Sequence, residues 1–289
     1  MPRMTPHAAC RWIWPCLVTA LTASVAIAGD AFRPTDDLLG RARLAWVAFE
    51  SALGSVLAEE DYRQEATWPQ TLPGNAVVRR LRSELLLFQV PGSSERVTFR
   101  HVEQVDGEPP LEPSPSIAAT LADTSRPLNA RVGELVRASA FYNLGDFERT
   151  INTPTFAAMV LRPEHTRRVR FHVEGETTID GQPVAVVRFE ETARPTIVRG
   201  HGTRDVPMRG RLWLRTDTGQ VLRSELVMKS SPNRVTATIE VDFGHDEGLQ
   251  MLVPQVMRER YEHRKHVVTT AARYTRYRRF TTSVRVIGD

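Results

Sequence analysis

Histidine and carboxylate side chains that lie close together in the sequence are the groups here that could bind a metal ion. His263 and His266 accompany Glu259 and Glu262, and His245-Asp246-Glu247 forms a second group. An imidazole with carboxylates can bind zinc without a cysteine. The first group lies in a basic run, which repels a cation, and the second is typical of a polar turn. We therefore predict no metal site.

The motifs of the main enzyme classes are missing from the sequence. It contains no G-x-S-x-G elbow, no Walker loop, no G-x-G-x-x-G after a strand and no H-E-x-x-H. His172-x-Glu174 resembles half of a zinc deaminase motif, but the cysteine pair of that motif is absent. Both side chains also fall on the exposed side of a predicted strand. We predict a non-enzymatic protein with no catalytic residues and no cofactor.

The first residues have the pattern of an export signal. Arg3 and Arg11 precede an apolar stretch from Leu17 to Ala28, which ends in the small-x-small sequence Ala26-Ile27-Ala28. We predict a signal peptide over residues 1–28 and a single domain over residues 29–289, located in the periplasm or secreted. A retained N-terminal anchor is the alternative. Both cysteines lie in this leader, so we expect no disulfide in the mature chain.

The charges of the chain are nearly balanced, with 38 Lys+Arg against 34 Asp+Glu. Nine cations and three anions nevertheless occur from residue 257 to 289. Arginines pair with phosphate in a bidentate manner, so this stretch could contact anionic headgroups or an acidic partner. The candidate contacts are Arg273, Arg276, Arg278 and Arg279, and the alternative is a solvated outer face of the last strands. Export and the lack of recognition motifs argue against nucleic acid, and we expect peripheral membrane contact or none.

Hydrophobic periodicity predicts one long helix followed by strands. Thr35-Asp36-Asp37 can cap a helix that runs to about Ala58, and from Tyr62 the period changes toward two. Short helices are expected over 117–121, 132–141 and 154–161. Regular alternation of apolar and polar residues over Val235–Phe243 predicts a strand with one solvent-exposed face.

These elements define an α+β fold of roughly eight to ten mostly antiparallel strands. We predict a strongly curved antiparallel sheet, a half-barrel, with the N-terminal helix and the short helices on its concave face. A two-sheet sandwich is the competitor, but it leaves the long leading helix without a role.

Several segments carry a family resemblance. The run Leu212–Leu222 and the strand Val235–Phe243 resemble the hairpin of LolA/LolB-like and RseB-like periplasmic proteins, in which a Trp-containing strand, a D-x-x-T-G-like turn and an amphipathic return strand recur. Here the turn is shortened to Asp217-Thr218-Gly219. Segments that look like an uncharacterised exported bacterial family are Tyr142–Gly145, Ile151–Thr155, Leu252–Met257 and Tyr274–Phe280.

The resemblance implies a hydrophobic cavity that carries or senses acyl chains of lipoproteins. The alternation predicts that every second residue of two strands points to the concave face of the sheet. The short helix at 154–161 supplies candidates for a lid over the cavity. The candidate ligand contacts are Val169, Phe171, Val173, Ala237, Ile239, Val241 and Phe243 on strands, and Phe156, Met159 and Val160 in the lid. The alternative for all of them is plain core.

The residue patterns and the resemblance lead to three hypotheses for the function. The first is a secreted non-enzymatic protein that binds or carries a lipid, an acyl chain or a lipoprotein. The second is an envelope interaction or regulatory module whose cavity is filled by its own side chains and whose partner is another envelope protein. A metal-assisted hydrolase is a third, weaker hypothesis that rests on the histidine groups alone.

Overall fold

The computed structural model describes residues 34–68, 76–90, 96–145, 149–200, 204–230, 235–264 and 266–279. The predicted signal peptide and residue Phe280 lie outside these ranges. From Pro34 onward the described residues belong to one compact unit. None of the described helices is both long and apolar enough to cross a membrane.

The leading helix is shorter than the sequence pattern predicts. Helix α1 covers Pro34–Leu53, and after Gly54 the chain enters strand β1, Ser55–Thr67. The prediction that the helix continues to Ala58 is therefore wrong. Gly54 has a poor helix propensity, and the residues after it alternate between buried and exposed side chains from Ala58 to Ala66.

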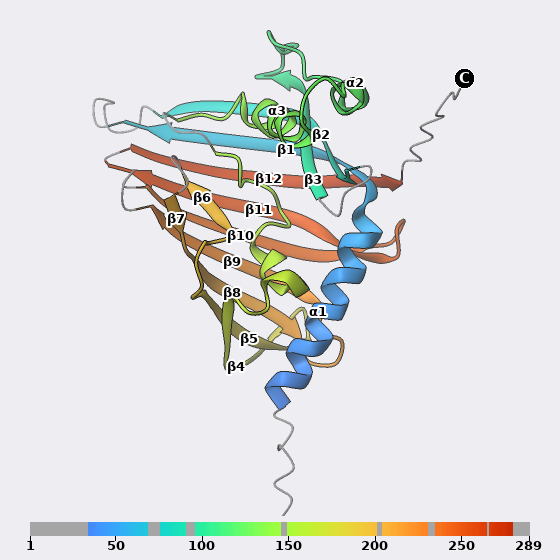
Figure 1. The fold of residues 1–289 in the computed structure, drawn as a ribbon, viewed down its shortest axis with the longest axis vertical. Helices are drawn as coiled ribbons and strands as arrows, with labels where there is room; N and C mark the ends of the chain where they lie inside the picture. The colour runs from blue at the N-terminus through green and yellow to red at the C-terminus, as the bar shows by residue number, and fades with distance from the viewer. Residues whose placement is uncertain are drawn as a thin grey trace, which may run out of the picture. The chain divides into compact units, whose positions relative to one another are not determined.

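Ten strands form one antiparallel sheet (Figure 1). Strand β1 pairs with β12, so segments from the two ends of the described chain lie side by side in the sheet. In spatial order the strands are β3 (Arg96–Val105), β2 (Val77–Gln89), β1, β12 (His266–Arg279), β11 (Met251–His263), β10 (Val235–Asp246), β9 (Val221–Ser230), β8 (Met208–Arg215), β5 (Gln182–Glu191) and β4 (Val169–Ile179).

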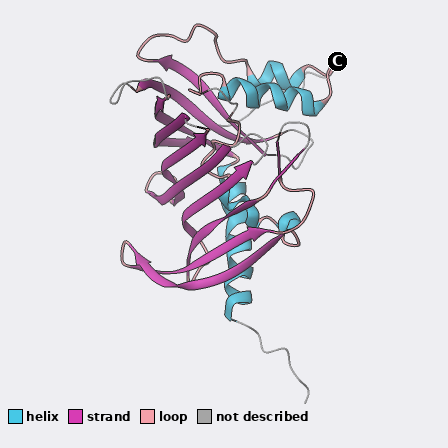
Figure 2. Cartoon of the chain, turned by 90° about the vertical axis from the view of Figure 1, so that its left-hand side faces the viewer, coloured by secondary structure: helices cyan, strands magenta, loops and turns pink. Residues whose placement is uncertain are grey.

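The α+β class with an antiparallel sheet, an N-terminal helix and short helices is confirmed, but the sheet shows no strong curl. The sheet is open, with β3 and β4 as its edges. Helix α1 crosses the strands on one side, as Figures 1 and 2 show. A helix layer packed on a sheet buries the apolar face of that sheet without bending it around a cavity.

Short helices cover parts of the sheet. Helices α2 (Ile117–Ala122) and α3 (Leu128–Ala140) lie near the edge strand β3 (Figure 1), and the short 3-10 helices are η1 (Ala157–Leu161) and η2 (Pro163–His165). The hydroxyl of Ser139 in α3 accepts from the backbone N–H of Arg100, which an edge strand would otherwise expose. Strands β6 (Val198–Gly200) and β7 (Arg204–Val206) form a separate pair.

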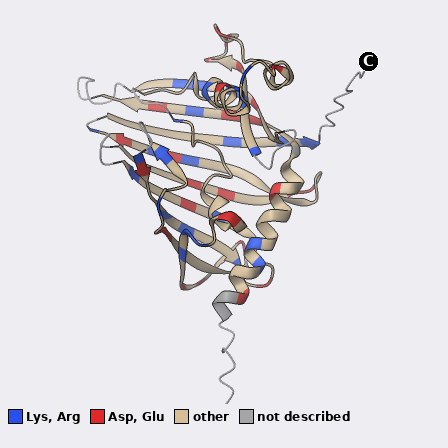
Figure 3. Cartoon of the chain, viewed as in Figure 1, with Lys and Arg blue, Asp and Glu red and all other residues tan. Residues whose placement is uncertain are grey.

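The main hydrophobic cluster joins α1 and η1 to strands across the sheet. Alternate residues of β10 are buried from Ala237 to Phe243, as the sequence predicts. Strand β2 is also apolar toward both sides, because Leu81 and Leu85 belong to the main cluster while Phe88 belongs to a second cluster with α3. Charged residues of both signs are distributed along the strands (Figure 3).

Candidate functional site

An apolar groove lies between α1 and the sheet. Its volume is about 240 Å³, and it lies where three neighbouring strands, β9, β10 and β11, meet the helix. Its walls are mostly apolar. The lining residues are Ala45, Trp46, Ala48, Phe49 and Ala52 of α1, and Gln220, Val221, Phe243, Met251 and Leu252 of the strands and the turn before β9.

Small side chains on α1 leave this space open. Ala45, Ala48 and Ala52 follow one another at steps of three and four residues, so they share one face of the helix. A methyl group fills far less of the gap to the sheet than a leucine would. From Ala45 to Ala52 the helix advances about 10 Å.

Three aromatic rings form the inner wall. The ring centroids of Trp46 and Phe49 are 4.8 Å apart, and Phe243 of β10 meets Trp46 edge to face at 6.4 Å. Phe49 and Phe243 are also edge to face, at 5.8 Å. These separations are favourable for aromatic pairs, so the three rings stabilise one another.

A close backbone contact fixes α1 at one end of the groove. A Cβ atom on Gly219 would lie 2.4 Å from the backbone nitrogen of Ala42, and Gly219 has a positive φ of 74°. Only glycine satisfies both conditions without strain. The turn before β9 therefore touches the helix directly.

Buried charges fix α1 nearer its C-terminal end. Glu50, which is 4% exposed, accepts from Nε of Arg162 at 2.9 Å and from Nη1 of Arg96 at 3.0 Å. Arg162 follows η1 and Arg96 begins β3. One carboxylate thus ties the helix to two distant segments.

The residues predicted to contact a ligand are spread across the sheet, because strands β9, β8 and β5 lie between β10 and β4, which carry the two predicted strand sets. All except Met159 belong to the main hydrophobic cluster or pack against it, and Met159 is half-buried within η1. Phe243 is the member of this set that also lines the groove. Sequence reasoning missed the α1 wall of the groove, although its alanine spacing is visible in the sequence. Ligand contact by the predicted residues stays a prediction.

The candidate anion-binding arginines are exposed on β12. Arg276 pairs with Glu59 at 3.0 Å, and Arg278 pairs with Glu84. Arg273 and Arg279 are also exposed and have no ion pair within the described residues. Contact of these arginines with an anion or a partner stays a prediction.

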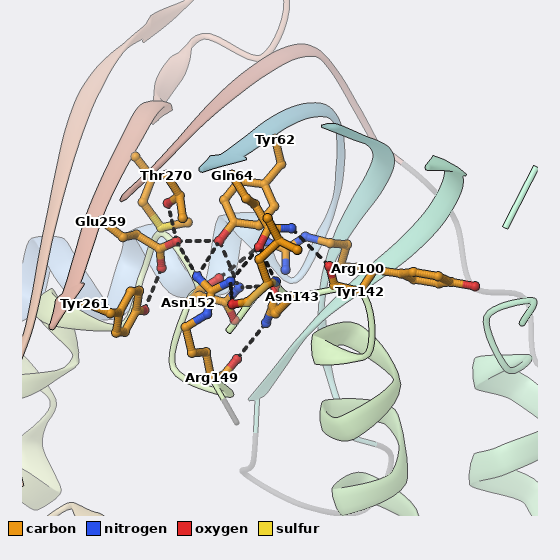
Figure 4. A network of polar contacts seen from close by, with 12 residues as sticks. Tyr62, Gln64, Arg100, Tyr142, Asn143, Arg149, Asn152, Glu259, Tyr261 and Thr270 are labelled. Carbon is orange, nitrogen blue, oxygen red and sulfur yellow. Dashed lines mark hydrogen bonds and ion pairs between the residues drawn. The ribbon is translucent and has the colours of Figure 1, made fainter. Parts of the chain in front are cut away.

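A buried polar network occupies another part of the core (Figure 4). The carboxylate of Glu259 in β11 accepts from the hydroxyls of Tyr62 at 2.5 Å, Tyr261 at 2.8 Å and Thr270 at 2.5 Å. The guanidinium of Arg149 lies 3.8 Å from the same carboxylate and donates to the Tyr62 hydroxyl at 3.2 Å. Both charged groups are fully buried.

A second buried ion pair adjoins the first. Arg100 of β3 donates through Nε and Nη2 to Glu60 of β1, and the Nη2 distance is 2.8 Å. Its guanidinium also stacks on the Tyr62 ring, 4.6 Å from the centroid. Burial alone would lower the pKa of Arg100, but the adjacent Glu60 carboxylate raises it above the ordinary value. Arg100 therefore stays charged.

The network fastens the segment that connects α3 to η1. Gln64 of β1 donates to the carbonyl oxygen of Tyr142 at 3.1 Å and accepts from the N–H of Leu144 at 2.9 Å. Burial, followed by Glu259, raises the pKa of Tyr62 to about 12. With both carboxylates matched by arginines, we interpret the network as a structural anchor.

Among the described residues, no group of three or more His, Cys, Asp or Glu side chains is placed to hold a metal ion. Glu259, considered above as a ligand with the histidines, lies instead in the buried network.

No protein-family model and no curated protein match the sequence. Solved structures similar to this chain include a putative outer membrane lipoprotein-sorting protein domain from Vibrio parahaemolyticus (12% identity, 86% of this chain and 94% of that one, TM-score 0.42). A second is a LolA superfamily protein from Nitrosomonas europaea, with 12% identity over 85% of this chain and 93% of that one and a TM-score of 0.33. A third is MucB in complex with MucA from Pseudomonas aeruginosa, with 13% identity over 86% of this chain and 100% of that one and a TM-score of 0.22. The resemblance to LolA-like and RseB-like proteins is found again among these neighbours, and it concerns the fold alone.

Proposed function

We propose that this chain is an exported, non-enzymatic protein that binds the apolar chain of a lipid or a lipoprotein in the groove beside α1. The apolar groove of about 240 Å³ is the observation that carries the proposal. Each buried methylene contributes about 0.8 kcal/mol, so a chain of about six methylenes gains roughly 5 kcal/mol. The sequence resemblance implies the same class of ligand, in the periplasm or outside the cell.

A groove-filling variant tests the proposal. Ala48→Phe places a ring in the groove, whereas Leu44→Phe adds a ring on the same helix at a side chain that is 75% exposed and outside the groove. We expect the wild type and Leu44→Phe to bind a neutral apolar dye, N-phenyl-1-naphthylamine, and medium-chain acyl esters to displace it. Ala48→Phe should lose at least tenfold in affinity. Equal binding by all three proteins would contradict the proposal.

Docking of an envelope protein is the second candidate function. Leu44 is 75% exposed and Val47 is 38% exposed, and both lie on α1 outside the groove. Exposed aliphatic side chains favour contact with an apolar segment of a partner. Under this hypothesis Leu44→Asp weakens capture of the partner while dye binding in the groove persists.

A further inference from the structure

The two edges of the sheet are protected differently. On the edge strand β3, the backbone N–H of Arg100 donates to the Ser139 hydroxyl at 2.9 Å. The backbone N–H of Val102 donates to the Ser114 hydroxyl at 3.0 Å. On the other edge, β4 pairs with β5 alone (Figure 1), and no described residue outside β5 makes a hydrogen bond to the backbone of β4. An edge strand with free N–H and C=O groups is a template for another strand.

The free backbone groups of β4 belong to alternate residues. Thr192, directly after β5, donates its backbone N–H to the carbonyl oxygen of Arg168 at 2.8 Å, in the register that continues into both strands. In an antiparallel pair, hydrogen-bonded positions alternate with positions whose backbone groups point away from the partner strand. The N–H and C=O groups of Val169, Phe171 and Val173 therefore face the open edge.

The side chains of this segment divide between the two faces of the sheet. Phe171 and Val173 are half-buried and pack against the main hydrophobic cluster. Arg170, His172 and Glu174 alternate with them and are exposed. The register with β5 shifts directly after Val173, so the regular part of the edge ends there.

We infer that β4 pairs antiparallel with β4 of a second copy of this chain, around a two-fold axis at His172. In this register Phe171 of one copy and Val173 of the other exchange their outward backbone hydrogen bonds and meet on the apolar face. Arg170, which has no ion pair within the described residues, lies directly opposite Glu174 of the second copy. Both ends of the paired segment thus gain a pair of opposite charges.

Neighbouring registers lack this match. If Phe171 lay opposite Phe171 of the second copy, Arg170 would face His172 and the opposite charges would not meet. If Val173 lay opposite Val173 of the second copy, the pairing would extend past the register shift, where the order of inward and outward backbone groups changes. The register centred on His172 satisfies the backbone groups, the apolar side chains and the charges together.

The interface is short, so we expect a weak dimer that forms reversibly as the protein concentration rises. No residue of β4 lines the groove beside α1, so the dimer forms whether or not the groove binds a ligand.

A disulfide between the two copies tests the position of the axis. Residues opposite each other at a non-hydrogen-bonded position have Cα atoms about 4.5 Å apart, a distance that a disulfide spans. His172→Cys, made with Cys10→Ser and Cys16→Ser, should therefore form a covalent dimer on mild oxidation, about tenfold faster than Arg188→Cys in the same background. Arg188 is the matched control, because it lies opposite His172 on β5, one strand away from the edge. Equal rates would overturn the axis at His172.

Charge reversal tests the contacts between the copies. Sedimentation equilibrium of the wild type should show a monomer and a dimer in equilibrium, and Arg170→Glu should weaken the dimer at least tenfold, because it brings two carboxylates together. Arg170→Glu combined with Glu174→Arg exchanges the charges and should restore the dimer.

Two results would contradict the dimer. A wild type that stays monomeric would overturn pairing with a second copy and leave the edge of β4 open to a different chain. If Arg170→Glu weakens the dimer and the folded double variant does not restore it, the pairing of Arg170 with Glu174 is overturned.

Discussion

The groove beside α1 and the polar network around Glu259 show two ways of filling the interior. In the groove, apolar side chains meet a helix face of alanines and leave space. In the network, Glu259 and Glu60 are each held by several donors, and the arginines that pair with them are almost fully buried. Apolar contacts are non-directional and tolerate a guest, whereas the charge pairs specify one arrangement. We conclude that the groove is adaptable and that the network is fixed.

Breaking a buried ion pair should have the largest effect on stability. Arg100→Met leaves the Glu60 carboxylate buried without its partner, and we expect a loss of about 3–5 kcal/mol in the free energy of unfolding. Urea denaturation measures this loss. Arg82→Met is the control, because Arg82 is exposed and lies 3.9 Å from Glu59, and it should cost less than about 0.5 kcal/mol.

A double variant sharpens this prediction. Arg100→Met combined with Glu60→Leu removes both charges, so it should recover much of the lost stability. If Arg100→Met costs less than about 1 kcal/mol, the network is not the rigid region that the comparison requires.

The sequence predicts the apolar half of this comparison better than the polar half. The alternation of β10 is confirmed. Glu60 and Gln64 lie at alternate positions of β1 whose side chains point into the core. From the sequence alone, however, each looks like an ordinary surface residue until its partner is known. Those partners come from β3 and from residues 142–149, which no local pattern places next to β1. The open sheet was also missed, because curvature is not encoded in alternation.

The second largest effect on the free energy of unfolding is expected from alkaline pH, which should weaken the polar network. Burial and then Glu259 raise the pKa of Tyr62 to about 12 from an ordinary value near 10. The folded state therefore holds this proton more tightly than the unfolded state. Its contribution is fully present below pH 10 and falls as pH rises toward 12, by about 2–3 kcal/mol.

The variant Tyr62→Phe isolates this contribution. Unfolding free energies of the wild type and Tyr62→Phe are measured at pH 8 and at pH 11. We expect a smaller alkaline loss in the variant, although Tyr261 and Tyr274, whose pKa values are also raised by burial, retain part of it. Identical losses in the two proteins would argue against a tightly held proton on Tyr62.

The smallest change in the free energy of unfolding is expected from substitutions on the outer face of the sheet. Arg276 and Arg278 are 70% and 49% exposed, so Arg276→Gln with Arg278→Gln should change the free energy of unfolding by less than about 1 kcal/mol. If these arginines bind an anionic headgroup, the double variant weakens sedimentation with phosphatidylglycerol vesicles at low salt. Unaltered sedimentation would favour a solvated face.

The position of a bound acyl chain tests the central claim most directly. Methionine methyl groups mark the two places where a ligand could lie, since Met251 lines the groove and Met159 is in η1, among the predicted lid residues. The protein with ¹³C-labelled methionine methyl groups is titrated with methyl decanoate and followed by NMR. We predict that the Met251 signal shifts in proportion to occupancy and that the signals of Met159 and of the buried Met208 stay in place. Shifts at Met159 or Met208 without a shift at Met251 would contradict the groove.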